Sequence, residues 1–566
     1  MYKVLIASAG LGNRLQGITK NINKALVSVN LKPAISHIIE KFPEDIELVI
    51  PVGYKKELVI DFCNIAYPSR KFSFVDVDLF EGEGSGLGYS ILKCKELLQC
   101  PFIFSSNDTI VLEDIPSPDY NWIGYSKNID SKTYRSIEIE NDNVSNLFGK
   151  GAGSDAYAYI GLSGIYDYEK FWQEMEDGKE SGSIEIGESF GLRALLGSII
   201  KPVEFTWFDT GNLIKLQETR EFFLNEDNSN NEHIILEKEE EAIFFVNNKV
   251  IKFSVDKDFI SNRTSRASLL QPFTPKVYDI KDNFYSYEWV SGSVLSTFVD
   301  SSAFMSFLNW IEDLWIDYDM DKNEKEIFNK ISYDFYKDKT YQRVSNYFKL
   351  AESYDMEESI NGKLIPKVYD LLDSLEWHEI MPKKSTRFHG DLHFENIICN
   401  KSVNGYEFKL LDWRQDFGGN INFGDIYYDL AKLNHGLIIS HRNIHNELYN
   451  VKKEVGKIEF DFQINYKNSE YQKIFYRWMR ENSFDTQKVD ILTSLIFLNI
   501  AALHHFPYNH KLPRRYFVDL LLMYLQYIPC NPKIHPRQYP LGWDCPHAPT
   551  LNNRLIHPSL YPSYLS

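Results

Sequence analysis

The stretch TRFHGDLHFENIICN, residues 386 to 400, contains side chains whose types and spacing suit phosphoryl transfer. Asp391 supplies a carboxylate that can accept a hydroxyl proton, and Asn396 supplies an amide oxygen that can bind a metal ion. About twenty residues on, the apolar run FKLL ends in Asp412, where a strand would present a second metal ligand. These residues predict a magnesium-dependent site in which Asp391 is the catalytic base.

This set of residues resembles the aminoglycoside phosphotransferase and choline kinase family over about residues 235 to 530. The resemblance implies that Lys252 in KVIKF meets the α- and β-phosphates of ATP. It also implies that YSYEWVSG joins two lobes, with Glu288 and Trp289 contributing to the nucleotide-binding segment. In the catalytic loop, the same resemblance implies that His389 braces the backbone.

Two parts of that family's pattern are missing from this sequence. The run EKEEEAIFFVNN lacks the glycines expected over ATP phosphates, and FISNRTSRASLL offers no helix glutamate as a partner for Lys252. Asp425 and Asp429 in FGDIYYDLAKL either belong to the site or bond to the backbone in a structural role. Two alternatives therefore stay open, an active kinase and a catalytically inert kinase-like module.

A second phosphate-handling pattern stands at the other end of the chain, in VLIASAGLGNRL. An apolar strand leads into a loop where Gly10 and Gly12 allow backbone N–H groups to approach an anion, and Arg14 adds a fork of donors. The pattern favours a phosphate-bearing ligand, although two glycines alone also fit an ordinary tight turn. Downstream, Asp108 in SSNDTIV and Asp209 in FTWFDTGN each follow an apolar strand, which predicts two carboxylates holding Mg²⁺.

With Lys24 in NKALV, this second set resembles the sugar nucleotidyltransferases over roughly the first 220 residues. The resemblance implies that the glycine loop, Arg14 and Lys24 bind and activate a nucleoside triphosphate, and that Lys150 in FGKG contacts the substrate. Asn13 and Asn23 depart from the family's pattern, which has Ser or Thr and Pro at these places. These departures leave the subfamily open.

The elements that must position these side chains form two different patterns. Residues 1–222 alternate β-rich runs with helical ones, which predicts an α/β, doubly wound, Rossmann-like domain with a parallel sheet. The polar run at 223–233 predicts a linker. Residues 234–530 begin with strands and continue as helices, so we expect an α+β, protein-kinase-like phosphotransferase domain, followed by a Pro/His/Tyr-rich tail at 531–566.

Two apolar segments in the second half have more than one interpretation. The aromatic run FMSFLNWIEDLWIDY, residues 304 to 318, has helical spacing and favours core packing over a cage for a quaternary amine. The run ILTSLIFLNIAALHHF, residues 491 to 506, is interrupted by polar residues and is shorter than the ~20 residues of a membrane span, so it predicts a buried helix.

Composition narrows the class of protein and its partners. The formal net charge of -18 disfavours nucleic acid as a partner, and the 566 residues favour more than one domain. Six dispersed cysteines and an N-terminus without an apolar signal region predict a cytoplasmic protein that is not inserted in a membrane. A homo-oligomer stays open.

Together the two patterns predict a bifunctional enzyme. One half would phosphorylate a small alcohol, a sugar or polyol, with ATP, and the other would couple that phosphate to a nucleotide from a second NTP with release of pyrophosphate. Mg²⁺ would serve both steps, and the product would be an activated building block for surface polysaccharide. The alternatives are a choline or ethanolamine kinase fused to a phosphocholine-type cytidylyltransferase, and a nucleotidyltransferase with an inert regulatory domain.

Overall fold

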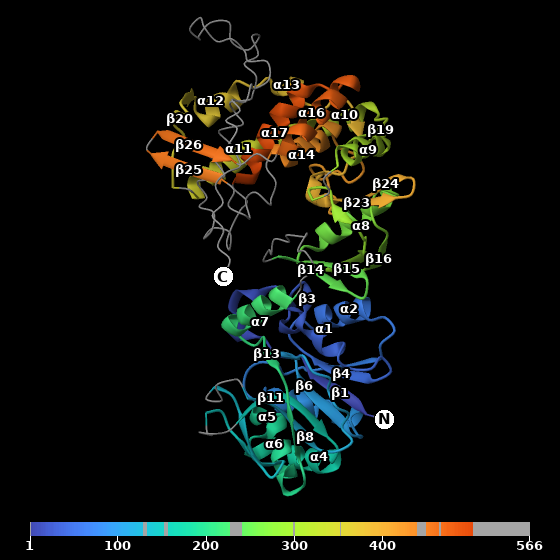
Figure 1. Cartoon of the computed structure of the whole chain (residues 1–566), viewed down its shortest axis with the longest axis vertical. Helices are drawn as coiled ribbons and strands as arrows, with labels where there is room; N and C mark the ends of the chain where they lie inside the picture. Colours follow the sequence, from blue (N-terminus) through green and yellow to red (C-terminus); the bar gives the residue numbers. More distant parts are fainter. Residues whose placement is uncertain are drawn as a thin grey trace, which may run out of the picture. The chain divides into compact units, whose positions relative to one another are not determined.

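The computed structural model describes residues 2–127, 133–151, 157–226, 240–297, 300–350, 352–438, 449–454, 456–462 and 466–501 (Figure 1). The chain divides into two compact units. The first contains Met1–Ile331, Lys383–Asn446 and Asn465–Phe475, and the second contains Ser332–Pro382, Glu447–Ile464 and Tyr476–Ser566. Most of the predicted linker and all of the predicted tail lie outside the described residues, so the predicted domain limits stay predictions.

A nine-stranded sheet forms the centre of the N-terminal region. Its parallel part has the order β6-β1-β4-β5, formed by β6 (Phe102–Ser106), β1 (Lys3–Ala7), β4 (Glu47–Val52) and β5 (Phe72–Asp76). The other half is built from β11 (Tyr157–Ile165), β8 (Trp122–Ser126), β9 (Ser136–Glu140), β10 (Asn143–Phe148) and β12 (Lys201–Glu204). In this half β11 runs antiparallel to β6, β8 and β9.

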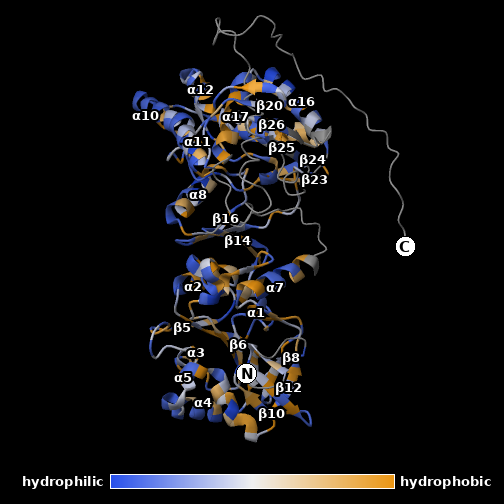
Figure 2. Ribbon diagram, turned by 90° about the vertical axis from the view of Figure 1, so that its left-hand side faces the viewer, coloured by the Kyte–Doolittle hydropathy of each residue, from blue (hydrophilic) through white to orange (hydrophobic). Residues whose placement is uncertain are grey.

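Alternating side chains of the central strands feed two cores, one on each face of the sheet. On β1, Val4 and Ile6 pack with α1 (Ala34–Ile39) and α2 (Lys56–Ala66), whereas Leu5 packs on the opposite face. The opposite face is covered by α3 (Leu87–Leu92), α4 (Tyr168–Asp177) and α6 (Glu188–Ala194). In Figure 2 the strands around β6 and β8 carry hydrophobic residues, while α4 shows hydrophilic ones.

The prediction of an α/β fold for this region is confirmed, with helices on both faces of the sheet. The prediction of a parallel sheet is wrong for β9, β10 and β11, which pair in antiparallel fashion, whereas β12 pairs with β8 in parallel. After β6 the chain does not return through a crossover helix. It continues through the short strand β7 (Thr109–Val111) and then β8 to β10, so β11 enters against the direction of β6.

A second, antiparallel sheet follows with the order β14-β15-β17-β16. Its strands are β14 (Glu241–Val246), β15 (Lys249–Ser254), β17 (Phe284–Glu288) and β16 (Val277–Ile280), and α8 (Lys257–Leu269) comes after β15. Phe244 lies 5.5 Å from Phe62 of α2, ring centroid to ring centroid. This sheet therefore shares a hydrophobic core with the first region.

The rest of the first unit is a small sheet with helices. The order β18-β23-β24 is formed by β18 (Ser293–Val294), β23 (Ile397–Ser402) and β24 (Gly405–Leu410). The helices of this part include α9 (Ser301–Ile311) and α14 (Ile426–Ile438). The aromatic run at 304–318 is core, because Phe304, Phe307, Leu308, Ile311 and Leu314 are fully buried. The prediction of core packing is confirmed.

The second unit combines a sheet with helices. The sheet has the order β21-β20-β26-β25, from β21 (Lys363–Ile365), β20 (Glu358–Ile360), β26 (Lys457–Phe462) and β25 (Tyr449–Glu454). Helices α11 (Lys339–Leu350) and α17 (Thr486–Ala501) contact each other. As far as it is described, the run beginning at residue 491 is the predicted buried helix. Across the described residues, no helix combines the length and the apolar character needed to cross a membrane.

Candidate functional site

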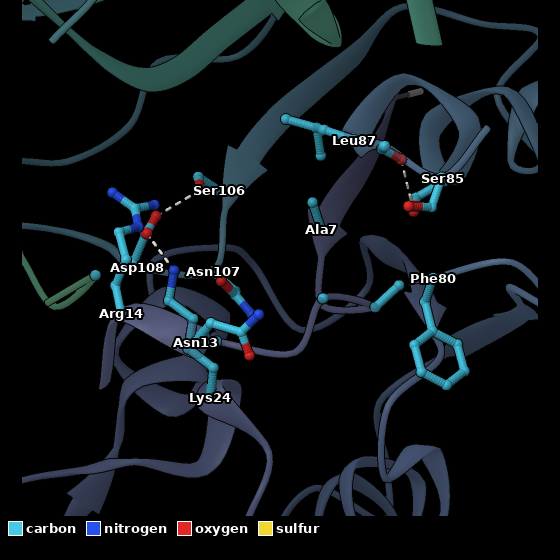
Figure 3. A pocket seen from close by; sticks show the side chains of 16 residues that line it. Ala7, Asn13, Arg14, Lys24, Phe80, Ser85, Leu87, Ser106, Asn107 and Asp108 are labelled. Carbon is cyan, nitrogen blue, oxygen red and sulfur yellow. Dashed lines mark hydrogen bonds and ion pairs between the residues drawn. The ribbon is translucent and has the colours of Figure 1, made fainter. Parts of the chain in front are cut away.

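A pocket of about 370 Å³ lies where β1 and β6 end, at the carboxyl edge of the parallel strands (Figure 3). It brings together five residues predicted from the sequence: Gly10, Gly12, Arg14, Lys24 and Asp108. In Figure 3 the charged residues occupy one side, and Phe80, Ser85 and Leu87 occupy the other. The pocket thus has a charged wall and a less polar wall, which suits the two ends of a nucleotide.

The backbone of the glycine loop packs closely against Lys24. Gly12 has a φ of 71°, and a Cβ on it would lie 3.0 Å from both Lys24 Cβ and Thr19 Cγ2. The buried Asn23 explains one departure from the family pattern, because its Nδ2 donates to the Tyr54 carbonyl (2.6 Å) and its Oδ1 accepts from the Ala25 amide (2.8 Å). Asn23 therefore fixes by hydrogen bonds a turn that a proline would fix by its ring.

Asp108 is the charged centre of this wall. It accepts hydrogen bonds from the Lys24 ammonium and the Ser106 hydroxyl. Burial raises the pKa of Asp108, but the Lys24 charge and these hydrogen bonds outweigh burial and lower the pKa to about 2. Asp108 is therefore a carboxylate at all working pH values.

Asp209 reaches the same place from a distant part of the sequence. Strand β13 (Trp207–Asp209) pairs with β7 so that Asp209 stands opposite Thr109. One of its carboxylate oxygens accepts from the Gly211 amide (2.6 Å) and the other from the Tyr134 hydroxyl (2.9 Å). Burial and the nearby charge of Asp108 raise the pKa of Asp209.

The two carboxylates face a common space beside the pocket. Asp108 Oδ2 and Asp209 Oδ1 both lie within 2.8 Å of the point that a Cβ on Gly211 would occupy. Because Gly211 has no side chain, this space stays open, and carboxylate oxygens are the ligands that Mg²⁺ prefers. The residues present therefore fit Mg²⁺, and the role of Asp108 and Asp209 as its ligands stays a prediction.

Sequence reasoning missed the two hydroxyl groups that hold these carboxylates, Ser106 and Tyr134. Ser106 lies two residues before Asp108, so its hydrogen bond to Asp108 could have been predicted from the local sequence. Tyr134 contacts Asp209 across a long stretch of sequence, and no local signal marks it. The Tyr134 ring also packs edge-on against Trp207, with ring centroids 4.9 Å apart.

Two other residues of this region differ in how they relate to the pocket. Asn13, which replaces the expected Ser or Thr, lines it. Lys150 is exposed just after β10 and is not among the residues that line the pocket. The role of Lys150 in substrate binding stays a prediction.

In the C-terminal region, the loop around Asp391 is fixed by buried groups. Asp429 of α14 accepts hydrogen bonds from the backbone amides of His389 (2.7 Å) and Gly390 (2.6 Å), and from Trp315 Nε1 (3.0 Å). His389 Nδ1 accepts from the Asp391 amide (3.2 Å), while Nε2 lies 2.9 Å from the Leu411 carbonyl and donates to it. The structural interpretation of Asp429 and the bracing role of His389 are therefore confirmed.

Asp412 pairs with two cations. Lys252 Nζ lies 2.5 Å from Asp412 Oδ1, and the Arg263 guanidinium of α8 contacts the same oxygen. Burial raises the pKa of Asp412, but Arg263 and Lys252 outweigh burial and hold the pKa far below its usual value. Arg263 is thus a cation on the helix where the family pattern has a glutamate, and sequence reasoning missed it.

Asp391 also lies beside two basic side chains. Lys432 Nζ of α14 lies 2.9 Å from Asp391 Oδ1, and His393 Nε2 lies 3.6 Å from Oδ2. Asn396 Nδ2 donates to the Asp391 carbonyl (2.9 Å), so the predicted metal ligand lies beside the predicted base. Burial raises the pKa of Asp391, but Lys432 and His393 lower it well below its usual value.

The segment predicted to contact adenine lies at the end of β17. The Glu288 carboxylate accepts from the Tyr278 hydroxyl (3.4 Å), and the Trp289 amide donates to the Asn248 carbonyl (3.0 Å). Trp289 is 44% exposed, and its ring packs edge-on against Phe245, with ring centroids 5.0 Å apart. Nucleotide binding by Glu288 and Trp289 stays a prediction.

Three known proteins are similar to parts of this chain. The bifunctional protein GlmU of Methanococcus vannielii is 29% identical over 234 residues, which is 39% of this chain and 54% of that protein. The UTP–glucose-1-phosphate uridylyltransferase AglF of Haloferax volcanii is 26% identical over 110 residues, 19% of this chain and 44% of that protein. A choline-phosphate cytidylyltransferase of Streptococcus pneumoniae is 49% identical over 57 residues, 10% of this chain and 25% of that protein.

The chain spans about half of the length of the GlmU relative. No family model matches the chain. The N-terminal region resembles sugar nucleotidyltransferases and a cytidylyltransferase, in agreement with the prediction from the glycine loop and the two aspartates. The resemblance of the C-terminal half to small-molecule kinases stays a prediction.

Proposed function

We propose that the N-terminal site transfers a nucleotidyl group from an NTP to a phosphorylated small alcohol. One observation carries the proposal: Asp108 and Asp209, from strands distant in sequence, direct carboxylate oxygens at one open space beside a pocket walled by the glycine loop. An oxygen of the acceptor phosphate attacks the α-phosphorus, the bond from that phosphorus to the β-phosphate oxygen breaks, and pyrophosphate leaves. The phosphate monoester needs no base, because it is already an anion.

Each residue of the site has a role in this step. Backbone N–H groups at Gly10 and Gly12 bind the triphosphate, and Arg14 and Lys24 neutralise the charge that develops on the leaving pyrophosphate. Lys24 forms an ion pair with Asp108, so its ammonium group is positioned beside the carboxylates. Bound Mg²⁺ would supply Lewis acidity at the phosphates. It would also reduce the repulsion between the negative charges of the triphosphate and of the acceptor phosphate.

Pyrophosphate release tests this function directly. The full chain would be given each of the four NTPs with Mg²⁺ and a panel of sugar phosphates, polyol phosphates, phosphocholine and phosphoethanolamine. We expect pyrophosphate release that depends on one NTP and one class of acceptor. Absence of release with every combination, from a folded protein, would contradict the proposal.

The acceptor has two candidates. A sugar or polyol phosphate is the first, because WFDTG resembles sugar enzymes and the N-terminal region is similar to the GlmU and AglF relatives. Phosphocholine is the second, supported by the similarity to a choline-phosphate cytidylyltransferase.

For the C-terminal site we propose an ATP-dependent kinase that makes the phosphorylated acceptor. Its support is that residues predicted from separate motifs form two neighbouring groups, one of Lys252, Asp412 and Arg263 and one of Asp391, Asn396 and Lys432. The backbone links the two groups, because the Leu411 amide, next to Asp412, donates to the Asn396 carbonyl (2.8 Å). The joint product would be a nucleoside-diphosphate building block of the kind that surface polysaccharides consume. ADP formation with ATP and a panel of sugars, polyols, choline and ethanolamine tests the kinase. No ADP above background would favour the alternative, an inert module that regulates the transferase.

A further inference from the structure

Within the described residues, the hairpin of β14 and β15 offers no flexible cover for the phosphates of ATP. No glycine occurs between Glu240 and Val255, and strands β14 and β15 are joined directly through Asn247 and Asn248, which have φ values of 51° and 57°. The turn is also occupied elsewhere, because Asn247 Nδ2 donates to the Ala66 carbonyl of α2 (2.9 Å). The turn is therefore held away from the role of a phosphate-binding loop, and side-chain cations must supply the phosphate contacts that its backbone amides do not.

Lys432 is the cation best placed for the terminal phosphate. It is an i+3 neighbour of Asp429 on α14, so one face of this helix holds both the backbone and the acidic side chain of the catalytic loop. Its side chain is only 14% exposed, and its Nζ lies 2.9 Å from Asp391 Oδ1. Lys252, by contrast, contacts Asp412 and not Asp391.

We propose that Lys432 is a phosphate-binding catalytic residue that contacts the γ-phosphoryl group during its transfer. The inference rests on the proposed kinase function of this site. The acceptor hydroxyl oxygen attacks the γ-phosphorus, the bond to the β-phosphate oxygen breaks, ADP leaves, and the hydroxyl proton passes to Asp391. A base that takes this proton must lie beside the γ-phosphorus, so a cation 2.9 Å from Asp391 also reaches the γ-phosphate oxygens.

The test separates a γ-phosphate contact from a structural role. In Lys432→Met we expect ADP formation to fall roughly 10²- to 10³-fold, as for loss of a preorganised charge. Affinity for ADP should stay within about twofold, whereas affinity for the non-hydrolysable analogue AMP-PNP should fall roughly tenfold, since only AMP-PNP carries a γ-phosphate. Lys432→Arg should restore a large part of both. Lys401→Met, an exposed lysine on β23, is the matched control and should behave as wild type.

Several results would overturn the inference. They are a Lys432→Met variant that forms ADP at the wild-type rate, or one whose affinities for ADP and AMP-PNP fall equally. Circular dichroism and thermal unfolding report whether the variant chain is folded as the wild type is. If Lys432→Met is not, Lys432→Gln, which keeps a hydrogen bond to Asp391 without the charge, decides in the same way. A wild type that forms no ADP with any acceptor removes the kinase function itself, which distinguishes that failure from failure of the role of Lys432.

Discussion

At the scale of single residues, the N-terminal site depends on two carboxylates with opposite pKa shifts. Lys24 lowers the pKa of Asp108, while burial and Asp108 raise that of Asp209. A divalent cation placed between them would stabilise both charged forms. A metal ion bound there would therefore offset the repulsion between the two carboxylates.

Asp209→Asn tests this arrangement. The amide can still accept the Gly211 hydrogen bond but has no charge, so we expect pyrophosphate release to fall at least roughly 10²-fold while ADP formation is unchanged. Tyr134→Phe, which removes one hydrogen bond to Asp209, should cost roughly tenfold or less. Asp108→Asn should match Asp209→Asn. Wild-type release rates in both asparagine variants would show that these residues are not metal ligands.

We expect the stability of the same region to depend on pH because of His37. Its Nε2 lies 3.1 Å from the Val29 carbonyl, and burial lowers the pKa of His37 to about 4. In the unfolded chain the pKa of His37 is near 6.5, so between about pH 6.5 and pH 4 the unfolded chain binds a proton that the folded chain does not bind. The free energy of unfolding therefore decreases as the pH falls from about 6.5 towards 4. At pH 5 the loss relative to pH 7.5 is about 2 kcal/mol.

Urea unfolding at pH 7.5 and pH 5, followed by circular dichroism, measures this effect. The wild type should lose about 2 kcal/mol more of its free energy of unfolding than His37→Gln over this interval. Equal losses in the two proteins would mean that His37 accepts a proton in the folded state.

The site residues found from the sequence share one property, since each stands in a local pattern. Gly10 and Gly12 follow a strand directly, and Asp391 and Asn396 lie within one loop. Tyr134 and Lys432 act on partners far away in the sequence, at Asp209 and Asp391, and only the folded chain brings them together. Sequence motifs therefore could not predict these two contacts.

At the scale of elements, the turn between β14 and β15 ties the second sheet to the first region. Asn247 Nδ2 donates to the Ala66 carbonyl (2.9 Å) and Lys249 Nζ to the Ile65 carbonyl (3.1 Å), both in the last turn of α2. Carbonyls at a helix C-terminus lack partners within the helix. Here they are satisfied by side chains from a sheet that the sequence assigns to the other half of the protein.

Asn247→Gly isolates this contact, because glycine accepts the positive φ of the turn and removes only the side chain. We expect a loss of about 1 kcal/mol in the stability of the N-terminal region, seen as a lower temperature of half-inactivation for pyrophosphate release. Asn248→Gly, at the next turn position, is the control and should have a smaller effect. Equal effects in both variants would show that the α2 contact contributes nothing.

The fold was predictable where the pattern of one element determines it. The apolar run of β1 and its glycine loop identify a strand followed by a phosphate loop. The direction of β11 was not predictable in this way, because it depends on the chain passing through β7 to β10 before it returns to β6. Strand direction is set by connections between elements, and single-strand periodicity carries no information about them.

At the scale of the whole molecule, the two candidate sites use separate sets of residues. Asp108 and Asp209 belong to the first and Asp391 and Asp412 to the second, and none of the described residues assigned to one site is assigned to the other. The proposed reactions are consecutive, since the phosphate made by one is the nucleophile of the other. A chain that loses one site should therefore keep the other reaction complete.

Mixing two inactive chains tests this independence. Asp391→Asn supplies an intact N-terminal site, and Asp108→Asn supplies an intact C-terminal one. Neither variant alone should convert the free alcohol into the nucleoside-diphosphate product, because each lacks one step. The mixture should form it, after a lag in which the phosphorylated alcohol accumulates in solution, as mass spectrometry of timed samples would detect. Asp391→Asn supplied with phosphorylated acceptor is the control and should react without a lag. If the mixture forms no product while each variant keeps its own half-reaction, the intermediate does not pass between chains, and the two sites must act within one chain.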